Sequence, residues 1–410
     1  MSQKKDVFYS LVTVIFPIII QMVFTIYVAH NVNRVHYGDF VLIQSMISGF
    51  SALLLTIPSA SFTRFYNQPG LKDRFINEFR TYNLLISFAA MFLCFFIWLI
   101  GLGDISLFEA MIIGITSILI FNFSLKKSSI FLEIERRKTF HISVMEKVSR
   151  FFFPIIFYIV FQSSTSLILG LVIGYILLNM MTYNYCDFPI WRFTLSKLRL
   201  TFYFRYAWPL MFVALFSWVV SFSDRYFIER YLTKAEVGEY SILAQFSGFM
   251  LIFGSVYTIY INPLLYKFYG ESKTKGFLLF YKSIATLIPI VIVLYFIFLV
   301  LPQSLIAIFI SPQLINKPGY ILILNILVAA ALVSVLVTVF SLKYTLNKRL
   351  DILAVAWLFA AVVNLIGNIF IRDYGIIAAA ISTLVSNITV LFVLLLFELS
   401  QKFIVRQSSL

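Results

Sequence analysis

Long apolar runs separated by short polar segments follow one another along the whole chain. A membrane-spanning helix needs about 20 predominantly apolar residues, and twelve runs are interpreted as spans, the fifth of them short. They cover residues 7–29, 40–62, 81–100, 106–125, 148–161, 166–186, 206–228, 240–264, 283–301, 320–342, 350–371 and 375–397. Because Pro312 and Pro318 flank a short polar piece, residues 304–310 are predicted to form a half-helix at the outer face. The pattern predicts an all-α integral membrane protein with twelve transmembrane helices.

Composition agrees with this interpretation. Hydrophobic residues make up 61% of the 410 and charged residues 12%, whereas a soluble domain carries about a quarter charged residues. The net charge of +14 is spread along the chain, not clustered as in a groove-binding patch, so no nucleic-acid partner is expected. Cys94 and Cys186 lie within apolar runs, which argues against a disulfide framework or a metal site. The N-terminus leads into the first run without a small-residue cleavage site, so that run is expected to be a helix and not a removed signal peptide.

The basic residues fix the predicted topology. With the N-terminus inside, the inner segments hold 26 of the 32 Lys and Arg residues, and the outer side with nearby helix ends holds six. Such a bias is typical of cytoplasmic connections. We therefore expect both termini in the cytoplasm. The outer connections are short, the longest being residues 302–319, so neither side carries a soluble domain.

One charge pair interrupts the seventh span. Asp224 and Arg225 follow an apolar helix, and the chain is expected to turn at Gly238 before it becomes apolar again. A charge in the middle of a bilayer costs about 2.5–3.5 kcal/mol on insertion scales, so such residues usually face a bundle interior or a wet cavity. Ser217 and Ser221 precede Asp224 at helical spacing and predict a polar stripe that lines a cavity.

The two halves of the chain share weak markers in the same order. Gly38 follows the first span and Gly238 the seventh, and a proline and then a basic residue follow each glycine. Parallel repeats of this kind build transporters from two halves related by an axis along the membrane normal. We predict two pseudo-symmetric six-helix lobes, residues 1–200 and 201–410. The alternative is that short membrane loops look alike by chance.

Two stretches carry a resemblance to a known family. Asp224-Arg225-Tyr226-Phe227-Ile228, with the Val-Gly-Glu-Tyr segment that ends at Tyr240, resembles the signature after the seventh helix of polysaccharide exporters. Asn364 and Asn368, followed by the Gly–small stretch from Gly375, resemble their eleventh-helix asparagines. The family is the O-antigen (Wzx-type) flippases of the multidrug/oligosaccharidyl-lipid/polysaccharide exporter superfamily. The likeness spans nearly the whole chain, but its motifs are short.

The resemblance implies a central cavity between the lobes that opens alternately to the two membrane faces. It implies transport of an undecaprenyl-diphosphate-linked oligosaccharide from the cytoplasmic to the periplasmic leaflet of the bacterial inner membrane, for O-antigen and lipopolysaccharide biosynthesis. The expected partners are this glycan, membrane lipids and possible further polysaccharide assembly proteins.

Each candidate substrate residue has a structural alternative. The Arg225 guanidinium offers a bidentate fork for phosphate oxygens, or the Asp224–Arg225 pair fixes helix packing. Arg64 at the inner end of the second span could meet phosphates, and the preferred alternative is an interfacial anchor. Arg34 on the outer side could receive the product, and the preferred alternative is an exposed loop charge.

Asn364 and Asn368 lie one turn apart on the eleventh span. Their amides could bind sugar hydroxyls, and hydrogen bonds between helices explain them equally well.

Other classes of function fit less well. The sequence has no GxSxG, HExxH, P-loop lysine or CxxC motif, so we expect a transporter, no enzyme, and no cofactor. A cation-coupled drug antiporter of the same fold would be expected to show more carboxylates within the membrane. A polysaccharide polymerase would need a large outer loop with catalytic Arg or His residues.

Overall fold

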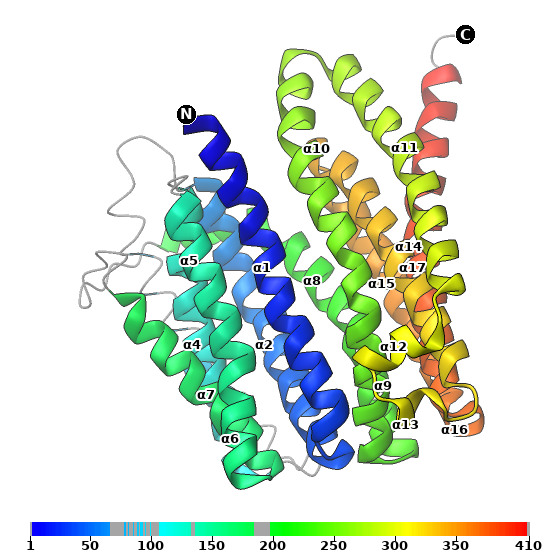
Figure 1. Ribbon diagram of the computed structural model, residues 1–410. Helices are drawn as coiled ribbons and strands as arrows, with labels where there is room; N and C mark the ends of the chain where they lie inside the picture. Colours follow the sequence, from blue (N-terminus) through cyan, green and yellow to red (C-terminus); the bar gives the residue numbers. More distant parts are fainter. Residues whose placement is uncertain are drawn as a thin grey trace. The chain divides into compact units, whose positions relative to one another are not determined.

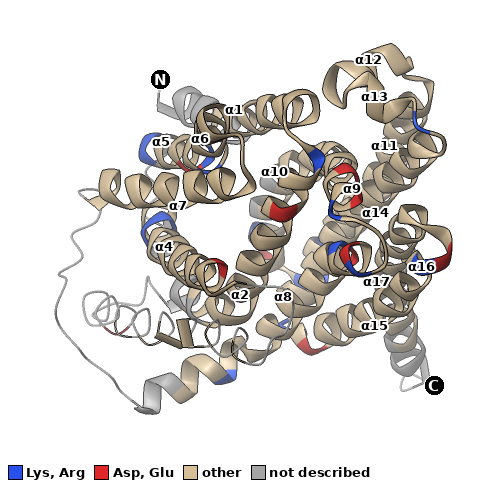
Figure 2. Cartoon of the chain, turned by 90° about the horizontal axis from the view of Figure 1, so that it is seen from below, with Lys and Arg blue, Asp and Glu red and all other residues tan. Residues whose placement is uncertain are grey.

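A computed structural model describes residues 2–65, 106–132, 136–183 and 197–407, with isolated helical positions between 78 and 99. This part of the chain is helical throughout and contains no strand (Figure 1). Charged residues are few along the helices, as Figure 2 shows. The predicted all-α class is therefore confirmed for the described residues.

The helices form two compact units, of which the first holds Met1–Phe24 and Val35–Leu215. Its helices are α1 (Ser2–Asn31, whose residues from Thr25 onward belong to the second unit), α2 (Arg34–Phe65, apart from Arg34), α4 (Leu107–Leu132), α5 (Arg136–Lys147), the π-helix η1 (Val148–Phe152), α6 (Phe153–Phe161) and α7 (Ser164–Met181). In this unit α7 packs along α6, η1 and α4.

The second unit holds Thr25–Arg34 and Phe216–Leu410. Its long helices are α8 (Lys197–Tyr231, whose first residues belong to the first unit), α9 (Lys234–Ser247), α10 (Leu251–Glu271), α11 (Lys273–Val300), α14 (Tyr320–Leu346), α15 (Leu350–Ile369) and α17 (Ile376–Gln407). The short elements are the 3-10 turn η3 (Gly248–Met250), α12 (Gln303–Phe309), α13 (Pro312–Ile315) and α16 (Ile371–Tyr374). In this unit α17 packs along both α14 and α15. The predicted short helix over 304–310 is confirmed as α12.

Nine helices of the described part are long and apolar enough to cross a membrane. They correspond to predicted spans two, four, six and seven to twelve, and α1 covers the first. The third, residues 81–100, lies mostly outside the described residues. The chain is a multi-pass helical membrane protein. Twelve spans and two symmetric lobes remain predictions.

The fifth helix is longer than its apolar run. The predicted span begins at residue 148, but the helix begins at Arg136 and continues through the π-helix to Phe161. At 1.5 Å per residue this is about 39 Å, more than the roughly 30 Å of a hydrocarbon core. The prediction was short because charged residues interrupt the apolar run inside the helix.

The start of α9 corrects the predicted turn at Gly238. The chain turns at residues 232–233, and Gly238 lies buried in the second turn of α9. Thr233 sets this start, because its hydroxyl accepts a hydrogen bond from the Glu236 backbone N–H at 3.2 Å. α1 ends at Asn31 and α2 begins at Arg34, and the α8-to-α9 connection repeats this spacing 200 residues later.

Candidate functional site

The buried carboxylate of Asp224 is the centre of the candidate site in the second unit. Asp224 is 2% exposed and lies two turns before the end of α8. Its Oδ2 accepts a hydrogen bond from the Tyr240 hydroxyl at 2.7 Å. Its Oδ1 accepts from the Arg225 backbone N–H at 2.8 Å and from the Arg225 guanidinium at 3.3 Å. The carboxylate thus links α8 to α9 and holds a neighbouring cation.

The Arg225 guanidinium is held in place but not saturated. It is 9% exposed, donates to the Ser221 carbonyl at 2.6 Å and lies 4.8 Å from the centroid of the Phe222 ring. Its Nε has no hydrogen-bond partner among the described residues. A guanidinium carries five donors, so Arg225 keeps capacity for an acceptor that is not part of the helix.

The predicted polar stripe divides between two environments. Ser221 is exposed and donates to the Ser217 carbonyl at 2.8 Å, and Ser217 is half-buried. Asp224, further along the stripe, is buried. The accessible part of this face of α8 is therefore the Ser217–Ser221 end.

The two asparagines form a buried network beside the cluster. Asn364 and Asn368 are both 0% exposed. Asn364 Oδ1 accepts from the Ser223 hydroxyl at 2.8 Å and from Asn368 Nδ2 at 3.1 Å, and Asn364 Nδ2 donates to Ser382 Oγ at 3.2 Å. These bonds join α8, α15 and α17, as the interhelical alternative predicts. Contact of either amide with a sugar remains a prediction.

Glu239, near the start of α9, forms a second set of contacts with other segments of the unit. It accepts from Lys317 Nζ at 2.5 Å and from the Tyr320 hydroxyl. Its neighbour Tyr240 binds Asp224, so two successive residues of α9 reach different helices. In the sequence Tyr240 stands out only as part of its motif, and its role as the partner of the carboxylate was missed.

The two remaining predicted residues are Arg34 and Arg64. Arg34 begins α2, is half-buried, and donates to the carbonyls of Val28 at 3.2 Å and Ala29 at 2.6 Å at the end of α1. It also donates to Ser311 Oγ at 3.3 Å, so it is a helix cap and not an exposed loop charge. Arg64 is a helical position near the end of α2, and its side chain lies outside what the structure describes.

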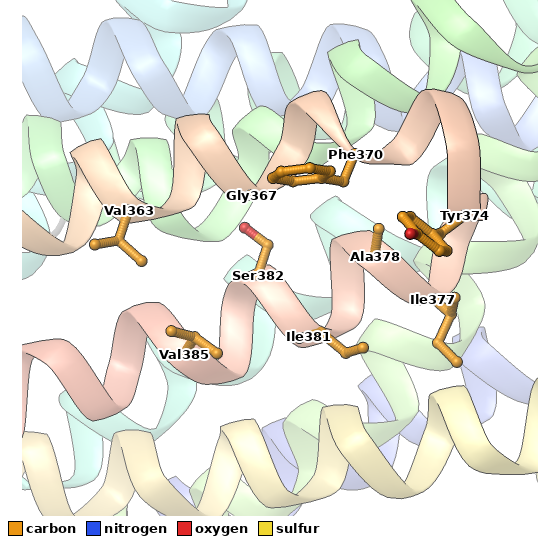
Figure 3. Close-up of a pocket in the computed structure, with 9 residues that line it drawn as sticks. All are labelled: Val363, Gly367, Phe370, Tyr374, Ile377, Ala378, Ile381, Ser382 and Val385. Atoms are coloured by element: carbon orange, nitrogen blue, oxygen red, sulfur yellow. The ribbon is translucent and has the colours of Figure 1, made fainter.

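An apolar groove of about 430 Å³ runs between α15 and α17. Figure 3 shows its lining side chains from both helices, with the Ser382 hydroxyl directed at α15 close to Gly367. A Cβ on Gly367 would lie 2.6 Å from Ser382 Oγ, so only glycine permits this approach. The groove therefore lies next to the asparagine network that leads to α8. Its lining consists of Val363, Gly367, Phe370, Tyr374, Ile377, Ala378, Ile381, Ser382 and Val385.

Comparison with known proteins identifies the fold. No protein-family model and no curated protein sequence matches the chain. A structure of the lipid II flippase MurJ in an inward closed conformation matches with a TM-score of 0.74 at 17% identity, over 96% of this chain and 87% of that one. The chain therefore shares its fold with this flippase structure.

Two MATE transporters support this. An inward-facing multidrug resistance MATE family transporter of the MOP superfamily matches with a TM-score of 0.72 at 12% identity, over 96% of both chains. A Vibrio cholerae MATE transporter matches with a TM-score of 0.60 at 13% identity, over 96% of this chain and 98% of that one. The chain thus shares the fold of these transporters, while membership of the superfamily and the O-antigen type remain predictions.

Proposed function

We propose that this protein is a flippase for an undecaprenyl-diphosphate-linked oligosaccharide of the O-antigen type. It moves this substrate from the cytoplasmic to the periplasmic leaflet of the bacterial inner membrane by alternating access. The likeness to MurJ and to MATE transporters supports a transporter but leaves the substrate open. The observation that carries the proposal is the balance of charge within the helices.

The carboxylates within the described helices are largely matched by bases. Glu146, Glu239 and Glu398 each pair with a lysine, at 2.5, 2.5 and 3.0 Å, and Asp224 pairs with Arg225 at 3.3 Å. Arg225 in turn keeps an unpartnered Nε. Intramembrane charges usually mark substrate pathways, and spare guanidinium donors suit phosphate oxygens. An anionic substrate fits this balance better than a cationic drug.

The residues take different roles in this proposal. Arg225 contacts the diphosphate, and Asp224 with Tyr240 orients it. Ser217 and Ser221 line the approach on the accessible face of α8.

More distant predicted residues take supporting roles. Asn364 and Asn368 brace α8 against α15 and reach sugar hydroxyls only if the helices separate. Arg64 and Arg34 act at the inner and outer ends of the path. The apolar groove between α15 and α17 accepts part of the isoprenoid chain, because its volume is in the range of small-molecule sites and its lining is almost entirely apolar.

A complementation experiment tests the Arg225 role. In a strain deleted for the gene, Arg225→Ala is expected to abolish surface glycan display while the protein is still found in the membrane, and Arg225→Lys to restore it in part. Arg349→Ala removes an exposed arginine of the same unit that pairs with Asp351 and serves as the matched control. Undiminished display with Arg225→Ala would contradict the phosphate-contact role.

A cation-coupled antiporter is the second candidate, and a specific observation favours it. Asp224 is a buried carboxylate on a transporter helix, as a proton-coupled site requires, in a fold shared with MATE transporters. Exchange of a fluorescent cationic dye against protons in inverted membrane vesicles tests this. If the parent exchanges the dye and Asp224→Asn does not, the antiporter replaces the flippase.

We also propose how the protein is oriented in the membrane and which proteins receive its product. Both termini lie in the cytoplasm of the bacterial cell, and other polysaccharide assembly proteins receive the product. A reporter fused at the C-terminus tests this, because green fluorescent protein is expected to fluoresce there and alkaline phosphatase to be inactive. The reverse result would contradict the orientation.

A further inference from the structure

Two basic residues of the first unit, Lys147 and Arg150, lie within the continuous helix formed by α5, η1 and α6. The His36 ring nitrogen lies 3.4 Å from the Tyr158 hydroxyl, so the end of α6 is level with the start of α2. Counting about 20 residues, one hydrocarbon thickness, back from Phe161 reaches residue 142. Lys147 and Arg150 therefore fall within the membrane depth.

A contact on α1 gives an independent estimate of this depth. Lys147 Nζ donates to Gln21 Oε1 at 3.2 Å. Gln21 precedes the end of α1 at Asn31 by ten residues, about 15 Å along the helix axis. This is half of a hydrocarbon core of about 30 Å, so Lys147 lies near the middle of the membrane.

A π-helix begins directly after Lys147 and contains Arg150. Residues Val148–Phe152 form η1, and Pro154, which follows, has no N–H to bond the carbonyl four residues earlier. Glycines of α7 pack directly on the widened turn: a Cβ on Gly174 would lie 2.2 Å from the Ser149 carbonyl oxygen, and one on Gly170 would lie 2.7 Å from that of Phe153. The bulge is thus fixed by packing, and such bulges occur frequently at functional sites.

Both cations gather around one aromatic ring. Lys147 Nζ is 5.2 Å and Arg150 Cζ is 5.5 Å from the centroid of Phe151. The nearest carboxylate, Glu146, is already bound to Lys127 Nζ at 2.5 Å. Among the described residues, the charged groups that act on the Lys147 ammonium are Arg150, Glu146 and Lys127. Together with Lys147, these groups carry a net charge of +2.

The Arg150 guanidinium lacks a hydrogen-bond acceptor in the part of the chain that the structure describes. It makes no hydrogen bond or ion pair with any described residue, although it is only partly exposed. Two like charges held close together in a medium of low dielectric repel each other strongly. An anion bound between them would remove this repulsion and fill the empty donor positions.

We propose that Lys147 and Arg150, with Gln21 beside them, form a binding site for a diphosphate group in the first unit. The planar Arg150 fork takes two phosphate oxygens, the Lys147 ammonium supplies a point charge, and Gln21 holds the Lys147 ammonium through its Oε1 at 3.2 Å. These residues belong to the first unit, whereas Asp224 and Arg225 belong to the second. That the diphosphate belongs to a lipid-linked glycan rests on the proposed function.

Calorimetric titration of the full-length protein tests this site. The protein is placed in nanodiscs of phosphatidylcholine and titrated with inorganic pyrophosphate and, separately, with farnesyl diphosphate. Lys147→Gln and Arg150→Gln are each expected to weaken binding of the probe about tenfold or more, and Arg150→Lys less. Arg137→Gln removes an exposed arginine of the same helix and is expected to bind as the parent does.

Folding controls and a comparison of the two probes determine how the binding result is interpreted. Elution and melting temperature of each variant show that it is folded, and Arg150→Lys tests the site if Arg150→Gln does not fold. Binding of farnesyl diphosphate in preference to pyrophosphate identifies a lipid-borne group, and equal binding a diphosphate of either source. Both support the site. The absence of diphosphate binding by the parent, or equal binding by the folded parent, Arg150 variants and Lys147→Gln, would overturn it.

The site and the proposed function can fail separately. A parent that binds diphosphate through Arg150 but translocates no lipid-linked glycan keeps the site and contradicts the flippase. A parent that translocates the glycan while Arg150→Gln binds diphosphate unchanged keeps the flippase and contradicts the site.

Discussion

Removal of the Asp224 carboxylate is predicted to destabilise the second unit strongly. Asp224 is 2% exposed and accepts hydrogen bonds from Tyr240 at 2.7 Å and from the Arg225 guanidinium at 3.3 Å. Asp224→Ala leaves the buried Arg225 cation without a counter-charge, held only by the Ser221 carbonyl and the Phe222 ring among the described residues. Breaking a buried pair by removing one member costs about 3–5 kcal/mol. Tyr240→Phe removes one hydrogen bond to a charged group, about 1.5–3 kcal/mol.

The double variant separates the pair from its surroundings. Asp224→Ala with Arg225→Ala removes both charges, so it is expected to be more stable than Asp224→Ala alone, because no uncompensated cation remains buried. The control is Asp351→Ala, whose ion pair with Arg349 is exposed, with the Asp351 side chain 60% accessible. That variant is expected to lose at most about 1 kcal/mol.

The assay is reversible unfolding in mixed micelles of lipid and detergent with increasing dodecyl sulfate, followed by tryptophan fluorescence. It gives the free energy of unfolding of each variant relative to the parent. The reasoning is refuted if Asp224→Ala loses no more than Asp351→Ala. It is equally refuted if the double variant is less stable than Asp224→Ala.

Two further predictions use the same membrane preparation. Gly174→Ala is expected to lose about 1–3 kcal/mol from overpacking against the Ser149 backbone, whereas Gly270→Ala, with no neighbour within 4 Å, should keep the parental melting temperature; equal melting temperatures for both would contradict the packing of α7. Glu398→Gln leaves the buried Lys343, bound at 3.0 Å, without its counter-charge, and is expected to lose about 3–5 kcal/mol of unfolding free energy; a parental value would show that the pair contributes little.

Apolar runs predicted most helices because a segment that spans a bilayer must satisfy its backbone hydrogen bonds internally, and a helix does so. They failed at the fifth helix, where Glu146, Lys147 and Arg150 interrupt the run. The helix continues through these residues because its backbone hydrogen bonds do not depend on whether the side chains are apolar, and hydropathy reports only the side chains. The turn was predicted at Gly238, but the helix already begins after Thr233, five residues earlier, because Thr233 caps it.

The candidate site was predictable in part. Asp224 and Arg225 stood out because charge within an apolar helix is costly. Their partner Tyr240 could not be predicted, since 16 residues is no helical spacing and the contact depends on how α9 rotates against α8. The basic pair at Lys147 and Arg150 was counted only within an inner loop; Pro154 close behind it was the available signal for a bulge.

Translocation by the purified protein tests the central claim most directly. Proteoliposomes that contain a fluorescent undecaprenyl-diphosphate oligosaccharide are treated with a membrane-impermeant quencher, and the accessible fraction is followed over time. The parent is predicted to render the whole pool accessible, and Arg225→Ala to leave the inner half protected as in protein-free vesicles. Protection of the inner half by the parent too, in vesicles that exchange a cationic dye for protons, would contradict the flippase and establish the antiporter.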